Sequence, residues 1–154
     1  MFFGFFRKKE SEEDGSPCYD NRLIERFAQD HRQLADAVKR IENSWNRGDW
    51  GKTIKLLKRM EKAVLDHFMQ EDLKLYWYLR KYYADDPAQL ATIRFFEDSI
   101  KPIQKEVVLF FDRYTRKDAI LDETFKKNFD SIVRELSRRI EAEEAQLYPL
   151  YRKR

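Results

Sequence analysis

The sequence VLDHFMQEDLKLY at residues 64–76 carries the pattern that decides the fold. Its apolar side chains Val64, Phe68 and Leu75 recur at steps of four and seven residues, which is the spacing of one face of an α-helix. His67 and Glu71 interrupt that face four residues apart, so the imidazole and the carboxylate point toward the same interior. Burying such groups is costly unless they pair or bind a metal. The stretch therefore predicts a helix whose core-facing stripe contains a polar site.

Three further apolar stripes predict that the rest of the chain folds into long helices of the same kind. The expected helices cover about residues 20–48, 50–83, 87–115 and 118–151. Asp20 is the expected N-cap of the first helix, and Gly48 is the residue at which that helix is expected to end. Short connections between long amphipathic helices make neighbouring helices antiparallel. We therefore expect an all-α fold, an antiparallel up-down-up-down four-helix bundle. Pro102 falls inside the third helix and is expected to kink it or to open its first half.

The composition agrees with a helical protein and argues against several classes of function. The 154 residues are 42% hydrophobic and 38% charged, and four Gly and four Pro are too few turn residues for an all-β fold. Acids and bases are interspersed to a net charge of +3 without a basic stripe, so no nucleic-acid partner is predicted. The sequence contains no nucleophile triad, phosphate-binding loop or nucleotide fingerprint. Its only cysteine, Cys18, excludes an intramolecular disulfide and makes a reducing, cytoplasmic compartment the expectation.

The first 17 residues differ in composition from the rest and are expected to form a flexible tail ahead of a bundle domain at residues 18–154. Aromatic side chains crowd its start, at Phe2, Phe3, Phe5 and Phe6, and three basic residues follow at positions 7–9. If exposed, these aromatic side chains would form an apolar patch. Three interpretations stay open: the tail packs on the bundle, enters a groove of a partner protein, or dips into a membrane surface beside its basic residues. The last would make the protein peripheral to the inner face of the membrane.

Polar residues interrupt the apolar stripes of two other helices. His31 lies in the stripe of the first helix, and Arg139 and Glu143 lie in that of the fourth. These residues are near the middle of their helices, as His67 and Glu71 are, so the bundle is expected to bring all five to one level of its interior. Bundle cores build metal sites from imidazole and carboxylate groups on facing helices. Such a mixed set of ligands suits iron, manganese or zinc.

An internal repeat relates the two halves of the chain. HFMQEDLKLY at residues 67–76 matches RIEAEEAQLY at residues 139–148, and FAQDHRQLADAV at residues 27–38 matches FEDSIKPIQKEV at residues 96–107. The first two helices therefore look like a copy of the last two. The tyrosines that end the repeat, Tyr76 and Tyr148, are predicted to serve packing.

Together these motifs resemble the hemerythrin-like family of HHE cation-binding domains over about residues 20–151. That family carries a His on the first helix, His-x-x-x-Glu on the second, a His on the third and His-x-x-x-Glu on the fourth, often with an acidic pair and Leu-Tyr-Pro. The chain keeps His31, the pair His67 and Glu71, and the ending EEAQLYP at residues 143–149. The resemblance implies a four-helix bundle with two iron ions, in which two histidines serve each ion and two glutamates bridge them.

Two departures from the family pattern lower the expected metal content. The third-helix histidine is replaced by Ile100, which has no donor atom, and the fourth-helix histidine by Arg139, which stays protonated. By the resemblance, one metal position keeps its ligands, which are His31, His67, Glu71 and Glu143. We expect at most one ion per chain, iron or else manganese or zinc, and a site without metal is the alternative. The guanidinium of Arg139 is hypothesised to replace the charge of the second ion and to pair with Glu143.

Three classes of function remain open on the sequence. The first is a hemerythrin-like metal-binding protein whose ion binds or senses a small diatomic ligand, oxygen or nitric oxide. The second is a metal-free, degenerate bundle that acts as a protein- or membrane-interaction and regulatory module. The third is an enzyme such as an oxidase or a nitric-oxide-handling protein. It is least favoured, because such chemistry usually draws on two metal ions.

Overall fold

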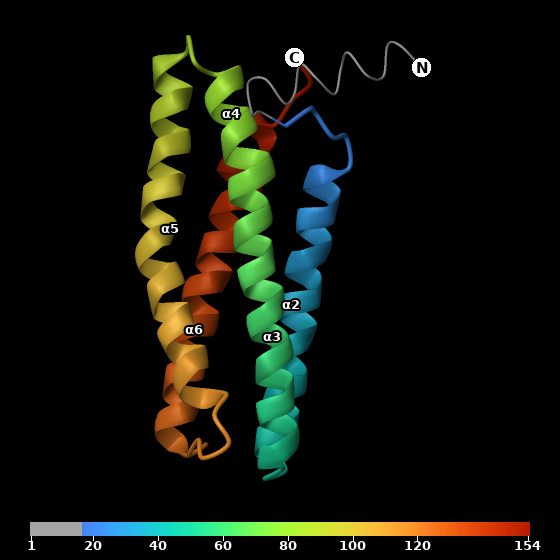
Figure 1. Ribbon diagram of the computed structural model, residues 1–154, viewed down its shortest axis with the longest axis vertical. Coiled ribbons are helices and arrows are strands. Elements are labelled where there is room, and N and C mark those ends of the chain that lie inside the picture. The colour runs from blue at the N-terminus through green and yellow to red at the C-terminus, as the bar shows by residue number, and fades with distance from the viewer. Residues whose placement is uncertain (1–16) are drawn as a thin grey trace.

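The computed structural model describes residues 17–154, which form the predicted all-α up-down-up-down bundle (Figure 1). The long helices are α2 (Leu23–Asn46), α3 (Trp50–Gln70), α5 (Pro87–Tyr114) and α6 (Glu123–Ala142). A π-helical turn, η1 (Glu71–Tyr76), joins α3 to the short helix α4 (Trp77–Tyr82). A second π-helical turn, η2 (Glu143–Leu147), follows α6 and leads into the 3₁₀ turn η3 (Tyr148–Leu150). Both ends of the described chain lie at the same end of the bundle.

Two helix starts lie further along the chain than the sequence predicts. α2 begins at Leu23 with Arg22 as its N-cap, because the carboxylate of Asp20 accepts a hydrogen bond from the Arg22 backbone at 2.9 Å and forms a turn before the helix. α6 begins at Glu123 rather than near residue 118. Its start is set by Asp122, whose carboxylate accepts from the Phe125 backbone N–H at 3.1 Å, as an N-cap does.

Pro102 does not divide α5, which runs as one helix from Pro87 to Tyr114. A proline inside a helix removes the hydrogen bond to the carbonyl four residues earlier, here that of Asp98. Both Pro102 and Asp98 are on the exposed face of α5, so water can satisfy that carbonyl. The predicted opening of the first half of this helix is therefore wrong.

A polar layer divides the core of the bundle into two apolar clusters. The cluster toward the α2–α3 turn contains, among others, Leu57, Val64, Phe111, Phe125 and Phe129. The cluster toward the chain ends contains, among others, Leu23, Phe27, Leu79, Ile93 and Phe96. The layer between them consists of buried ionisable side chains with at most 8% exposure: His31, His67, Glu71, Arg139 and Glu143. The middle of the bundle is therefore the place where charge must be balanced without water.

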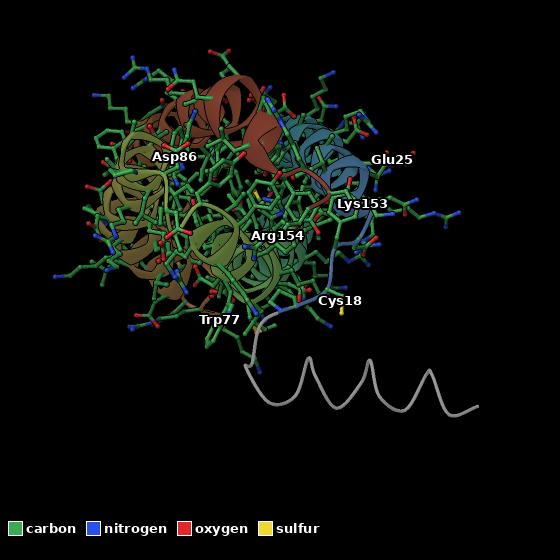
Figure 2. The ribbon with its side chains drawn as sticks, turned by 90° about the horizontal axis from the view of Figure 1, so that it is seen from above. Cys18, Glu25, Trp77, Asp86, Lys153 and Arg154 are labelled. Carbon is green, nitrogen blue, oxygen red and sulfur yellow. The ribbon has the colours of Figure 1, made fainter. Side chains whose placement is uncertain are left out.

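Side-chain hydrogen bonds to backbone carbonyls hold chain segments in place at both ends of the bundle. At the end seen in Figure 2, which carries Asp86, Lys153 and Arg154, the hydroxyls of Tyr78 and Tyr83 donate to the carbonyls of Arg152 and Leu150 at 2.6 and 2.7 Å. At the opposite end the Trp45 indole donates to the carbonyl of Leu121 at 2.8 Å. These contacts hold the C-terminal segment and the loop before α6 in place.

The N-terminal aromatic residues Phe2, Phe3, Phe5 and Phe6 lie outside the described residues, so the tail, its contacts and the domain boundary at residue 18 stay predictions. Among residues 17–154, none of the helices is long and apolar enough to cross a membrane.

The two glycines at the α2–α3 turn offer a matched test of the turn. Gly48 has φ +71°, the left-handed region, whereas Gly51 lies in the first turn of α3 with open space where a Cβ would be. We expect Gly48→Ala to lower the free energy of unfolding by about 1 kcal/mol through backbone strain. Gly51→Ala should raise it by about 0.5 kcal/mol, because alanine loses less backbone entropy in a helix. Urea unfolding of both variants measures these changes in the free energy of unfolding. Equal changes in the two variants would contradict the prediction.

Candidate metal centre

The two histidines of the chain meet inside the polar layer. His31 comes from α2 and His67 from the last turn of α3, and both are about 5% exposed at the side chain. Their Nε2 atoms are 3.2 Å apart. The rings are edge to face, with centroids 4.9 Å apart. Two imidazole nitrogens from different helices therefore face one point.

A carboxylate holds the other nitrogen of each histidine. Nδ1 of His31 is 2.9 Å from Oε1 of Glu144, and Nδ1 of His67 is 2.8 Å from Oδ2 of Asp30. A carboxylate can only accept, so each Nδ1 carries the donated proton. This contact fixes the ring orientation and turns Nε2 toward the interior, which is the arrangement that protein metal sites use to orient their histidine ligands.

Two buried glutamates complete the group. Oε1 of Glu71 is 3.3 Å from Nε2 of His67, and Oε1 of Glu143 is 3.8 Å from Nε2 of His31. His31, His67 and Glu143 each offer a ligand atom within 4.8 Å of the others, a group that could hold a metal ion. Glu71 adjoins it through His67. The structure thus brings together the four residues that the sequence analysis singled out.

The buried carboxylates and imidazoles perturb one another's protonation. Burial alone would lower the pKa of His67, but its contacts with Glu71 and Asp30 outweigh burial and raise that pKa to about 9. Burial would raise the pKa of Glu71, but its hydrogen bond to His67 keeps that pKa below the usual value. Burial and the nearby charge of Glu71 raise the pKa of Glu143 well above its ordinary range. The layer therefore takes up protons to balance its negative charge, and a metal cation would serve the same purpose.

Arg139 fills the other side of the layer, and each of its three side-chain nitrogens has a hydrogen-bond acceptor. Its Nε donates to Oε2 of Glu143 at 3.1 Å, and one terminal nitrogen donates to Ser99 Oγ at 2.8 Å. The other donates to the hydroxyl of Tyr76 at 2.8 Å and to the carbonyl of Phe96 at 2.7 Å. The guanidinium also lies over the Phe96 ring, 4.8 Å from its centroid. This permanent positive charge is thus bound to one of the two buried carboxylates.

Two tyrosines also belong to the polar layer, although their positions in the sequence predict a role in packing. The hydroxyl of Tyr148 donates to Oε2 of Glu71 at 3.0 Å and lies 3.2 Å from Nε2 of His31. Tyr76 accepts from Arg139 in the other half of the layer. Each follows a buried glutamate by five residues, a spacing that puts them about 140° apart around a regular α-helix. The π-helical turns η1 and η2 turn less per residue and carry both tyrosines back toward the interior.

Comparison with protein families agrees with this geometry. Residues 22–151 match the model of the hemerythrin HHE cation binding domain. The chain belongs to the hemerythrin HHE family. Comparisons with curated proteins and with solved structures gave no match.

Against the hemerythrin pattern, the layer of this chain has two unequal halves. The histidine half contains His31, His67, Glu71 and Tyr148. The arginine half contains Ile100, Arg139 and Tyr76, and Glu143 lies between the halves, with Oε2 on Arg139 and Oε1 3.8 Å from Nε2 of His31. Ile100 is buried where the family has a histidine and offers no donor atom. Only the histidine half has imidazole nitrogens directed to a common point.

The ion pair of Arg139 with Glu143 predicts a large effect of removing the guanidinium. We expect Arg139→Ala to lower the free energy of unfolding by about 3 kcal/mol, because it leaves buried acceptors on Glu143, Tyr76 and Phe96 without their donor. The exposed neighbour Arg138 provides the control, and Arg138→Ala should change stability by less than about 0.5 kcal/mol. Thermal and urea unfolding of chelator-treated protein compare the two. An Arg139→Ala melting temperature equal to that of the unmodified chain would show that Arg139 does not balance the layer.

Proposed function

We propose that this hemerythrin HHE protein binds one iron-like ion in the histidine half of the layer and presents it to a small diatomic ligand, oxygen or nitric oxide. One observation is the main support for this proposal. Nε2 of His31 and Nε2 of His67 approach to 3.2 Å while a carboxylate holds each Nδ1. When a cation displaces the proton of His67, two imidazoles held in this way direct their Nε2 lone pairs at one point, which suits a cation between them.

The chemistry of the donors fits such an ion. His31 and His67 would supply nitrogen ligands, and two glutamates would supply oxygen ligands: Glu143, which follows α6, and Glu71, one turn after His67. Two histidines with carboxylates suit iron, manganese or zinc, and two histidines with one carboxylate are a common set for non-haem iron. A bound iron would supply a redox-active Lewis acid able to take up a diatomic ligand.

The arginine half supports a content of one ion rather than two. Arg139 already pairs with Glu143 at 3.1 Å and contacts Ser99, Tyr76 and Phe96. A second cation there would meet a guanidinium that cannot lose its proton. The two like charges would repel each other strongly in a layer without water.

A groove between α2 and α6 offers a route for a small ligand. It has a volume of about 450 Å³ and reaches His31, the histidine nearest to it. Its walls are mostly apolar, and their apolar members include Leu34, Val38, Met60, Val133, Leu136 and Ile140. An apolar passage of this kind suits an uncharged diatomic molecule better than an ion.

The metal content of the purified protein tests the proposal. Protein from iron-rich medium, purified without chelator or histidine tag, should contain about one iron, manganese or zinc ion per chain by elemental analysis. His67→Ala should lose the ion because a central ligand is gone, whereas Asp66→Ala, at the exposed neighbouring position, should retain it. The reduced, iron-loaded protein should also give a nitric-oxide-dependent change in its electron paramagnetic resonance spectrum.

Two outcomes of that measurement contradict the proposal. Two ions per chain would mean that Arg139 does not exclude a second metal. No ion in a folded protein would mean that the site is vestigial. The metal-free alternative, an interaction module acting through the N-terminal tail, would then be the function to test.

A further inference from the structure

The hydroxyl of Tyr148 contacts two of the predicted metal ligands, Glu71 and His31. It reaches the site from η3, while its neighbours Glu71 and His31 belong to η1 and α2. Its oxygen is 3.0 Å from Oε2 of Glu71 and 3.2 Å from Nε2 of His31. The side chain is 4% exposed, and its ring stacks on that of His31 with an angle of 12° between the planes. The hydroxyl is therefore held in one position inside the histidine half.

The distances between neighbouring atoms in this group match those between adjacent ligands of one ion. Metal–ligand bonds of about 2.1 Å place adjacent donor atoms about 3.0 Å apart at right angles and about 3.4 Å apart in a tetrahedron. Within the histidine half, the Nε2–Nε2 distance is 3.2 Å and the distance from His67 Nε2 to Glu71 Oε1 is 3.3 Å. The two distances from the Tyr148 oxygen, 3.0 and 3.2 Å, fall in the same range.

Proton counting separates this arrangement from an ordinary hydrogen-bond network. Tyr148 has one hydroxyl proton, and it donates that proton to Glu71. Nε2 of His31 lies within hydrogen-bond distance of the same tyrosine oxygen. The single hydroxyl proton cannot lie in both contacts at once. A cation bound to the tyrosine oxygen and to the histidine nitrogen would occupy the second contact.

Resting on the proposed function, we propose that Tyr148 is a further ligand of the metal ion, alongside His31, His67, Glu71 and Glu143. The tyrosine binds as a phenolate: its O–H bond breaks, the proton passes to solvent, and the oxygen forms a bond to the ion. No electron is transferred in this step. Tyr76 is the matched tyrosine of the other half. Its hydroxyl contacts Arg139 and, within residues 17–154, forms no hydrogen bond to an imidazole nitrogen.

The experiment uses the full chain, stripped with a chelator and reloaded with ferrous ion that is then oxidised in air. A ferric ion bound by a phenolate absorbs visible light, whereas one bound only by imidazoles and carboxylates does not show that band. We expect the unmodified chain and Tyr76→Phe to be coloured, with tyrosinate ring vibrations in the resonance Raman spectrum. Tyr148→Phe should lack the band and bind iron about tenfold more weakly or worse. Circular dichroism checks that both variants fold.

The possible results separate this proposal from the function on which it rests. Iron bound at one per chain without a visible band would overturn the role of Tyr148 and leave the metal site intact. A band that survives in Tyr148→Phe, or that disappears only in Tyr76→Phe, would also overturn it. No iron bound by any chain would overturn the metal site, and the tyrosine ligand with it. Zinc loading gives a colourless reference with the same ligands.

Discussion

The structure depends on one constraint, the balance of charge in a layer of ionisable side chains that lies between two apolar clusters. Water does not balance these charges, because His31, His67, Glu71, Arg139 and Glu143 are all at most 8% exposed. Each charge must therefore be met by a partner within the layer. The carboxylate of Glu71 pairs with the protonated imidazole of His67, and that of Glu143 pairs with the guanidinium of Arg139.

The two halves of the internal repeat meet this constraint differently. In the arginine half, Arg139 supplies a fixed positive charge with a hydrogen-bond acceptor for each of its nitrogens. In the histidine half the positive charge is exchangeable, because a proton on His67 can be released in favour of another cation. The Arg139 side chain thus occupies the arginine half permanently, whereas the histidine half remains able to bind an ion. This difference is the basis of the proposed single-metal site.

Much of this could be predicted from the sequence, and the exceptions have physical reasons. The apolar periodicity determined the bundle, and polar residues within the stripes identified His31, His67, Glu71 and Glu143, because both patterns depend on helical geometry alone. Asp30 and Glu144 could not be recognised, since exposed acids on a helix look alike until the fold brings them to a histidine. Tyr148 was missed because a regular helix turns it away from Glu143. The repeated spacing of glutamate and tyrosine in both halves was the available sign of a π-helical turn.

The central claim, one cation in the histidine half and a guanidinium in the other, has a direct structural test. Crystals of the iron-loaded protein, measured with X-rays at the iron absorption edge, locate every bound iron by its anomalous scattering. We predict a single peak enclosed by His31, His67, Glu71 and Glu143, and none on the Ile100 side of Arg139. A second peak next to Arg139, or no peak between the two histidines, would contradict it.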